Sequence, residues 1–279
     1  MRNRIRPQAF ITHILIIIIC FISIYPVFIM VSGALKTATE LTYNVSGFPR
    51  QPTAENFFRL INFNGGLVLR TFGNSVFVSS CYTILVVIIA SLAGFAFAKY
   101  KFPGRDALFI LLLVTMMIPT ELNITPLYLI FSKIKWLNTY YVQIFPGIAN
   151  VFSMFLMRQY MLTIPDSLIE AARIDGAGDF FTFRCIILPI STPAIGALAI
   201  LQFLSKWNEL IMPRITLTKQ ELMPIMLILP TLNELDYARA VPWELVLAGC
   251  TLVTIPLIIV FLLFQNKFLA SVTLGAVKG

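Results

Sequence analysis

Long apolar runs separated by short polar segments dominate this sequence. An α-helix rises 1.5 Å per residue, so about 20 apolar residues cross the roughly 30 Å hydrocarbon core of a bilayer. Five runs of that length carry no Asp, Glu, Lys or Arg, and a sixth is interrupted only by Glu121. The runs are residues 7–35, 71–98, 107–132, 136–157, 185–205 and 245–266. They predict six transmembrane helices at about residues 11–35, 71–98, 107–131, 138–158, 187–211 and 244–265.

The composition supports this all-α, polytopic membrane fold. Of the 279 residues, 58% are hydrophobic and 12% are charged, whereas soluble domains carry about 25% charged residues. The first run is too long for a removable signal peptide, whose apolar region spans about 7–15 residues. Because no repeat of fixed period is visible, we expect one transmembrane domain over residues 1–279.

Charge placement predicts the orientation of the spans. The net charge of +8 is scattered between the apolar runs, so nucleic-acid binding is not expected. An even number of spans puts both termini on one side, and loops rich in Lys and Arg face the cytoplasm. The residues that assign this side are Arg2, Arg4, Arg6, Lys99, Lys101, Arg105, Arg158, Arg173 and Arg184. Both termini, including the tail 266–279, are therefore predicted to be cytoplasmic.

The segment 164–189, between the fourth and fifth runs, is predicted to form two short helices at an angle, which we call the elbow. Ser167 and Glu170 match a capping box at the start of the first helix. Gly176 suits the left-handed conformation that ends a helix. Asp179 is expected to cap the second helix, and Pro189 to end it.

The elbow has two interpretations on spacing alone. Its small side chains would let a partner protein approach the backbone closely, which suits docking. A capped helix in a loop is also a common connector between two spans, and spacing alone favours this simpler interpretation.

The residue pattern favours docking, because the segment resembles the EAA loop of binding-protein-dependent, ATP-driven importers. The matching residues are Glu170, Ala171, Ala172, Asp175, Gly176 and Ala177. Resemblance to the carbohydrate-importing, maltose-type permease family extends over nearly the whole chain. It includes Lys36-Thr37, Asn74-Ser75, Met117-Ile118-Pro119, Pro126-Leu127-Tyr128, Trp207-Asn208-Glu209 and the tail from Leu274 to Gly279.

The resemblance implies a permease subunit of an ABC importer in a bacterial or archaeal inner membrane. The expected partners are a second permease subunit, two copies of an ATP-binding subunit and an extracytoplasmic solute-binding protein. The elbow is expected to sit in a cleft of the ATPase. The tail residues expected to reach between the ATPase subunits are Gly275, Ala276, Val277, Lys278 and Gly279. The solute is expected to be a sugar or oligosaccharide.

The chain is not expected to be an enzyme. It lacks the G-x-x-x-x-G-K-[ST] loop that cradles the phosphates of ATP, so hydrolysis falls to a partner subunit. Neither cysteine nor histidine spacing indicates a metal site, and no cofactor is expected. The carboxylates of Glu121 and Glu209, inside or at the end of predicted spans, leave an ion-coupled secondary transporter or channel as the alternative function.

A polar face is predicted near the end of the fifth span. Placing a charged residue at the bilayer centre costs roughly 2.5–3.5 kcal/mol on insertion scales, so it needs a partner or water. Lys206 and Glu209 are three residues apart and can pair on one helix face, which Gln202 extends. This face suits a polar track for solute, or equally an ion pair that locks helices beside an interfacial Trp207.

The third span is interrupted between Pro119 and Pro126. Prolines leave backbone carbonyls that must face protein or water, which suits a broken helix at a cavity. The alternative is a span that ends near Ile118 and continues as a re-entrant stretch. The candidates for a translocation path are Glu121, Asn123, Asn150, Gln202, Lys206, Asn208 and Glu209.

Overall fold

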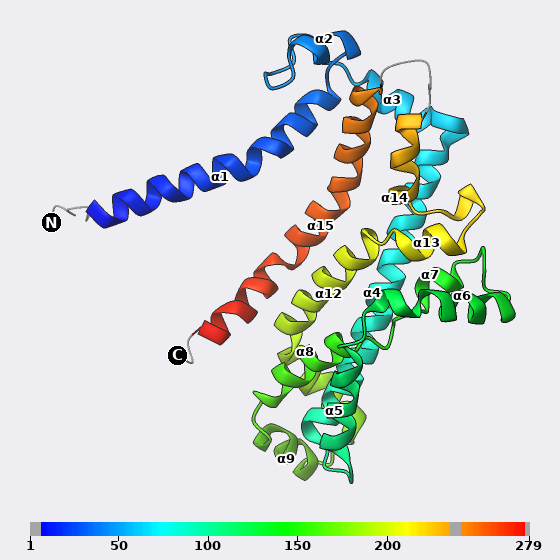
Figure 1. The fold of residues 1–279 in the computed structure, drawn as a ribbon. Helices are drawn as coiled ribbons and strands as arrows, with labels where there is room; N and C mark the ends of the chain where they lie inside the picture. Colours follow the sequence, from blue (N-terminus) through cyan, green and yellow to red (C-terminus); the bar gives the residue numbers. More distant parts are fainter. Residues whose placement is uncertain (1–6, 235–240, 277–279) are drawn as a thin grey trace. The chain divides into compact units, whose positions relative to one another are not determined.

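The computed structural model is all-helical in the residues that it describes (Figure 1). It describes the backbone of residues 7–234 and 241–276, and the side chains of residues 11–232 and 241–265. The chain divides into two compact units, residues 1–69 with 228–255 and residues 70–227 with 256–279.

The first unit contains three helices, two short turns and the start of the last helix. These elements are α1 (Pro7–Ala34), α2 (Ala38–Tyr43), α3 (Glu55–Asn62), 3-10 turns at Phe63–Gly66 and Leu229–Glu234, and the beginning of α15 (Trp243–Ala276). Arg59 of α3 and Glu244 of α15 form an ion pair of 3.4 Å. α1 and α15 approach closely at Gly33, where a Cβ atom would collide with the Leu247 side chain.

A buried lysine holds together the lobe that follows α1. Lys36 is fully buried, and its Nζ donates to the carbonyl oxygens of Asn44 (2.6 Å), Val45 (3.3 Å) and Gly47 (2.7 Å). The Asn56 amide donates to the Lys36 carbonyl (2.7 Å). Burial lowers the pKa of the Lys36 ammonium, and the nearby Glu40 carboxylate opposes this shift.

The second unit contains α4 and the helices that follow it. These are α4 (Leu67–Lys99), α5 (Arg105–Thr115), α6 (Ile124–Lys133), α7 (Tyr141–Ile144), α8 (Val151–Leu162), α9 (Ser167–Ile174), α10 (Asp179–Thr182), α11 (Leu188–Ile190), α12 (Thr192–Trp207), α13 (Ile211–Thr216) and α14 (Ile225–Ile228). Two 3-10 turns, Thr120–Asn123 and Gln220–Leu222, and a π-helical turn, Phe183–Ile187, connect some of them.

α4 is the long helix around which the second unit is built. Within this unit, α5, α8 and α9 gather around its last turns (Figure 1). Gly94 lets α8 approach, since a Cβ there would lie 2.7 Å from the Met157 Cβ and 2.9 Å from the Arg158 nitrogen. Small residues allow this close backbone contact between membrane helices.

Three helical stretches are long and apolar enough to cross a bilayer, namely Ile11–Ala34, Glu55–Lys99 and Trp243–Gln265. Two bent helix pairs raise the number to five if each pair is one span. The described residues therefore provide three to five candidate spans.

The third and fifth predicted spans are bent instead of continuous. In the third, α5 and the segment Thr120–Lys133 meet at 88° after a break that contains Pro119. In the fifth, Asp179–Ile190 and α12 meet at 77° around Ser191. An apolar run predicts that its residues are buried in lipid or protein. It does not show whether those residues form one continuous helix or two helices that meet at an angle.

The predicted fourth span, 138–158, is not a single helix. α7 ends at Ile144 and α8 begins at Val151. The break contains Pro146, which has no N–H to donate, and Gly147, which has a left-handed φ of 81°. The Tyr82 hydroxyl donates to the freed Gly147 carbonyl at 3.2 Å. α8, with 12 residues, spans only about 18 Å and cannot cross the hydrocarbon core alone.

We expect Lys36→Met to destabilise the lobe by about 2–3 kcal/mol. The substitution keeps the volume but leaves three carbonyls without their donor, and one unsatisfied buried group costs about 1–3 kcal/mol. Partial access of water to these carbonyls limits the total. Thermal unfolding in detergent and limited proteolysis of residues 38–53 measure the loss. Thr39→Ala, at an exposed hydroxyl, should change neither, and unchanged proteolysis of Lys36→Met would contradict the prediction.

Candidate functional site

The first elbow helix, α9, runs from Ser167 to Ile174 and is followed by a left-handed residue. Gly176 has φ 81°, and a side chain placed there would meet no atom within 4 Å. The Gly176 and Ala177 N–H groups donate to the carbonyls of Arg173 and Ala172 (3.0 and 2.9 Å). These bonds satisfy the last carbonyls of the helix.

The predicted capping of both elbow helices is wrong. Ser167 lies inside α9 as its first residue, the N-cap is Asp166, and no side chain caps this end. The N-cap of α10 is Gly178, while Asp179 lies in the first turn and pairs with Arg173 at 3.3 Å. The Asp166 carboxylate pairs with Lys99, and the Asp179 carboxylate pairs with Arg173. Neither carboxylate therefore caps the helix beside it.

Pro189 also does not end the second elbow helix. The helix continues to Ile190 because the π-helical turn Phe183–Ile187 precedes the proline. A widened turn accommodates a residue that cannot donate to the preceding turn. The chain bends later, at Ser191.

One face of the elbow is packed into an apolar core of the second unit. Ile169, Ile164 and Phe183 are buried there with residues of α4, α8 and α12. The Phe183 ring lies 5.3 Å from that of Phe95 on α4. Burial of this face fixes the elbow against the ends of three helices.

The opposite face of the elbow is exposed. It carries small, acidic and apolar side chains of α9 and the following turns, and Ile174 is 86% exposed. The exposed residues of the predicted docking pattern are Glu170, Ala171, Asp175 and Gly176, whereas Ala172 is buried and Ala177 half-buried.

A buried lysine at the end of α4 also holds the elbow. The Lys99 side chain is only 4% exposed, and its Nζ donates to the Ile164 carbonyl (2.5 Å) and the Asp166 carboxylate (2.6 Å). The Lys99 ammonium lowers the pKa of Asp166 below its usual value. Lys99 thereby joins α4 to the segment between α8 and α9.

A second group of polar side chains surrounds the Lys206–Glu209 pair, and we call it the polar cluster. Lys206 Nζ lies 2.6 Å from the Glu209 carboxylate and 4.8 Å from the Tyr82 ring centroid. The pair lines a small cavity of about 10 Å³, which is about the space that one water needs. The polar cluster consists of Asn74, Ser75, Ser79, Tyr82, Gln143, Lys206 and Glu209.

Side chains of the polar cluster bind the backbone of residues 221–225, where the 3-10 turn Gln220–Leu222 leads into α14. Asn74 donates to the carbonyls of Glu221 (2.8 Å) and Met223 (3.1 Å). Gln143 donates to the Leu222 carbonyl at 3.1 Å, and the Ser75 hydroxyl accepts from the Ile225 N–H at 2.8 Å. This segment lies directly beside the ion pair, because Pro224 lines the same cavity.

Trp207 is a core residue and not the interfacial belt residue that the sequence suggests. It is 1% exposed. Its ring stacks on Phe203 (5.6 Å) and meets Phe72 edge-on (5.8 Å).

The other path candidates are dispersed. Gln202 is buried on α12. Asn150 caps α8 by accepting from the Ser153 N–H (2.8 Å), and Asn208 donates to the Leu204 carbonyl (2.9 Å) at the end of α12.

Glu121 and Asn123 are exposed in the turn between α5 and α6, and they do not line the cavity. In the tail, Gly275 and Ala276 belong to the last turn of α15. Val277, Lys278 and Gly279 lie outside the described residues.

Sequence reasoning missed two residues that organise this region. Lys99 reads as one more basic loop residue, and Tyr82 as an ordinary residue of an apolar helix. Only their tertiary contacts reveal their roles. For Asn74 and Ser75 the signal was available, since both belong to a motif shared with the permease family.

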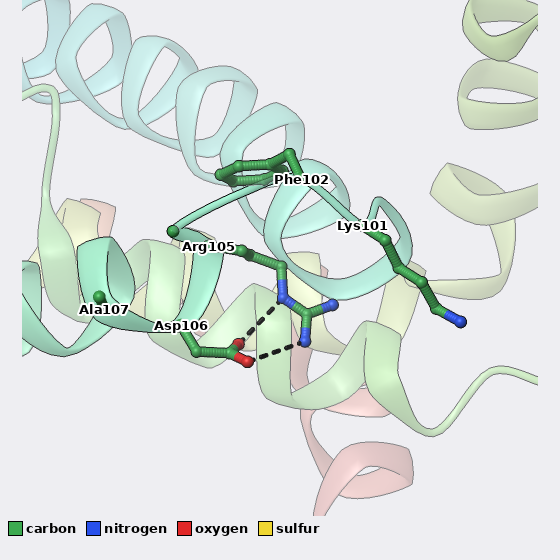
Figure 2. Close-up of a pocket in the computed structure, with 6 residues that line it drawn as sticks. Lys101, Phe102, Arg105, Asp106 and Ala107 are labelled. Carbon is green, nitrogen blue, oxygen red and sulfur yellow. Dashed lines mark hydrogen bonds and ion pairs between the residues drawn. The ribbon is translucent and has the colours of Figure 1, made fainter.

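A surface pocket between α4 and α5 was also not predicted (Figure 2). Figure 2 shows the Arg105 guanidinium facing the Asp106 carboxylate, at 2.9 and 3.3 Å, while Lys101 points away. Arg105 also donates to the Tyr100 carbonyl at 3.2 Å. Because Arg105 and Asp106 in this pocket pair with each other, we interpret the pocket as a structural feature of the α4–α5 turn.

Comparisons with known proteins agree with this architecture. An arabinooligosaccharide transport system permease of Halalkalibacterium halodurans is 35% identical over 94% of this chain and 93% of its own length. An sn-glycerol-3-phosphate transport system permease of Brucella abortus is 32% identical, covering 94% and 95%. A maltodextrin transport system permease of Bacillus subtilis is 29% identical, covering 100% and 98%.

The fold matches a solved structure as well. A chain of a bacterial ABC transporter involved in the import of the polysaccharide alginate aligns with a TM-score of 0.81, at 22% identity, over 96% of this chain and 99% of that one.

Helical spans, an elbow with one buried and one exposed face, and a buried polar cluster define a multi-pass membrane permease. The chain belongs to the family of binding-protein-dependent transport system inner membrane components, whose profile matches residues 71–273. It is a transport component of an ABC importer and not an enzyme.

We expect Glu209→Gln to lower the free energy of unfolding by about 2 kcal/mol. Breaking a fully buried ion pair costs about 3–5 kcal/mol, and the partial exposure of Glu209 reduces this cost. Adding Lys206→Met removes the unpaired charge, so the double variant should be more stable than Glu209→Gln alone.

Thermal unfolding in detergent compares the single and double variants. Glu221→Gln, at an exposed 3.2 Å pair with Arg70, is the matched control and should cost less than about 1 kcal/mol. If the stability losses of the two single variants simply add up to the loss of the double variant, the charges of Lys206 and Glu209 do not stabilise each other.

Proposed function

We propose that this chain is the membrane-spanning subunit of a carbohydrate importer, and that an ATPase subunit docks on its elbow. The observation that carries the proposal is the two-sided elbow. Its buried face is packed among α4, α8 and α12, while its exposed face presents Glu170, Ala171 and Ile174. A partner that moves this face would move the ends of three helices with it.

The docking surface extends over the predicted pattern of residues. Glu170, Ala171, Asp175 and Gly176 contact the ATPase directly, and the buried Ala172 lets α9 lie close against the rest of the unit. Ala177 continues the turn. The tail Gly275–Gly279 reaches toward the same ATPase subunits. Two copies of the ATPase and a second permease subunit complete the membrane assembly.

The chain crosses the inner membrane six times, with both termini in the cytoplasm. α7 and α8 together make the fourth crossing, and the two bent pairs make the third and fifth. Non-helical backbone is tolerated at membrane depth where protein binds it. The Tyr82 bond to the Gly147 carbonyl supports this arrangement for the fourth crossing.

The solute is a sugar or oligosaccharide that a soluble binding protein delivers. Relatives named for arabinooligosaccharides and maltodextrin align over most of the chain. Within the polar cluster, hydroxyl, amide and charged groups lie together, and such groups bind hydroxyl-rich solutes. Gln202, Lys206 and Glu209 lie on the translocation path, Asn150 and Asn208 cap the helices that frame it, and Glu121 with Asn123 marks the bend of the third crossing.

We expect Gly176→Leu to abolish solute uptake and the control of ATPase activity without preventing membrane insertion. The left-handed conformation strains any residue other than glycine by about 1 kcal/mol, and leucine also adds bulk on the docking face. Gly176→Ala carries the same strain without the bulk and therefore separates the two effects. Uptake into proteoliposomes and ATP hydrolysis are measured for both variants. Normal uptake by Gly176→Leu would disprove docking at this surface.

Purification through an affinity tag on this chain tests the class of importer. We expect an ATP-binding subunit and a second permease subunit to co-purify, which mass spectrometry identifies. The solute-binding protein that stimulates the complex should bind arabinotriose or maltotriose in calorimetry. Binding of glycerol-3-phosphate alone would retain the importer and reject the carbohydrate assignment, and absence of an ATPase subunit would reject both.

A further inference from the structure

Lys99 is the most deeply buried basic residue at the elbow end of α4. Its side chain is 4% exposed, yet its carboxylate partner, Asp166, is 75% exposed. The second acceptor is the Ile164 carbonyl, which follows α8. A single ammonium group therefore joins the last residue of α4 to the connection between α8 and α9.

This bond differs in kind from the apolar contacts around it. The core beside it contains Ala98, Met161 and Ile169, whose attraction is non-directional. The Lys99 hydrogen bonds are directional, because each requires donor and acceptor to keep a narrow range of distance and angle. Lys99 thus fixes the position of α4 against the elbow along the helix axis.

α4 connects Lys99 with the polar cluster as one uninterrupted helix. Asn74 is 25 positions before Lys99 in one helix that has no proline, a distance of about 37 Å along the axis. The same helix also supplies Ser75, Ser79 and Tyr82 to the polar cluster. The predicted third, fourth and fifth spans are bent or broken, whereas α4 is one continuous helix through this range.

The far end of α4 is also bonded to a neighbouring backbone segment. Asn74 and Ser75 hold the backbone of residues 221–225, and the Tyr140 hydroxyl donates to the Asn74 side chain at 2.8 Å. A shift of α4 along its axis must move this backbone segment or break its bonds. The segment lies beside the Lys206–Glu209 pair.

We propose that α4 transmits movement of the elbow to the polar cluster, and that Lys99 is the positioning residue that joins elbow and helix. The inference rests on the proposed function, because an ATPase must move the elbow. Lys99 itself contacts neither the ATPase nor the solute. Its loss should separate ATP hydrolysis from rearrangement at the polar cluster.

The test measures rearrangement at the polar cluster without any solute. In the complete importer purified with its ATPase subunits, Cys20, Cys81, Cys185 and Cys250 are replaced by serine, and Ser79→Cys is added as a maleimide target. Labelling rates are compared without nucleotide and with ATP plus vanadate. ATP hydrolysis is measured in parallel. Ser79 is 1% exposed, so its labelling rate reports whether the polar cluster opens.

Lys99→Met should keep ATP hydrolysis but lose most of the nucleotide-dependent change in labelling rate. We expect this change to fall roughly tenfold, which lies within the range of about 5–150-fold typical of coupled sites. Lys99→Arg keeps the charge and should restore the response. Lys101→Met removes an exposed basic residue of the same loop and should change nothing. A merely structural role would reduce hydrolysis and the labelling response together.

A full response in Lys99→Met overturns the inference. If that variant does not assemble, Asp166→Asn decides, because it keeps the bond to the Ile164 carbonyl. A reduced response in Asp166→Asn supports the inference, and an unchanged response overturns it. A further outcome is that the labelling rate is the same with and without nucleotide in every protein, even the one that keeps Lys99. In that case the proposed coupling to the ATPase is wrong, and the inference fails with it.

Discussion

Backbone outside a helix must find hydrogen-bond partners within the protein when it lies at membrane depth, because lipid supplies none. The second unit contains such a stretch at residues 145–150, within the predicted fourth span, and a shorter irregular link at residues 223–224, outside the predicted spans. Side chains of α4 bind at both places: Tyr82 holds the first, and Asn74 and Ser75 hold the backbone around the second. α4 is one continuous helix, and its polar side chains thereby stabilise the break between α7 and α8 and the link that leads into α14.

The two ends of α4 are bonded by different chemistry. The end near the polar cluster uses neutral hydrogen bonds to backbone groups, which can be exchanged one by one for bonds to water when a cavity opens. The other end combines an apolar core with the ammonium of Lys99, whose side chain is 4% exposed and whose carboxylate partner, Asp166, is 75% exposed. The two ends of α4 are therefore held by different kinds of interaction.

The sequence predicted the features that depend on local composition. Apolar length predicted α1, α4 and α15 as helices long enough to span a membrane, and spacing predicted the Lys206–Glu209 pair. Gly176 was assigned to the left-handed region because few other residues adopt it without strain.

Features that depend on distant partners were not predictable. The capping box at Ser167 does not form, and the neighbouring Asp166 pairs with Lys99, which is 67 residues away in the chain. The apolar run 136–157 was predicted as one span, although the Pro146-Gly147 dipeptide within it is a local turn signal. The bond that makes this break tolerable comes from Tyr82, on another helix. Trp207 was misplaced for the same reason, since only packing distinguishes a core tryptophan from an interfacial one.

Solute identity is harder to infer than transport class because the residues that indicate each of them are distributed differently along the chain. The elbow is a short continuous segment, so its pattern can be read directly from the sequence. The polar cluster draws residues from α4, α7, α12 and the segment that follows α12, and each position can change separately. A permease named for arabinooligosaccharides and one named for glycerol-3-phosphate are accordingly almost equally similar to this chain, at 35% and 32% identity. Overall identity to these relatives therefore does not distinguish one solute class from another.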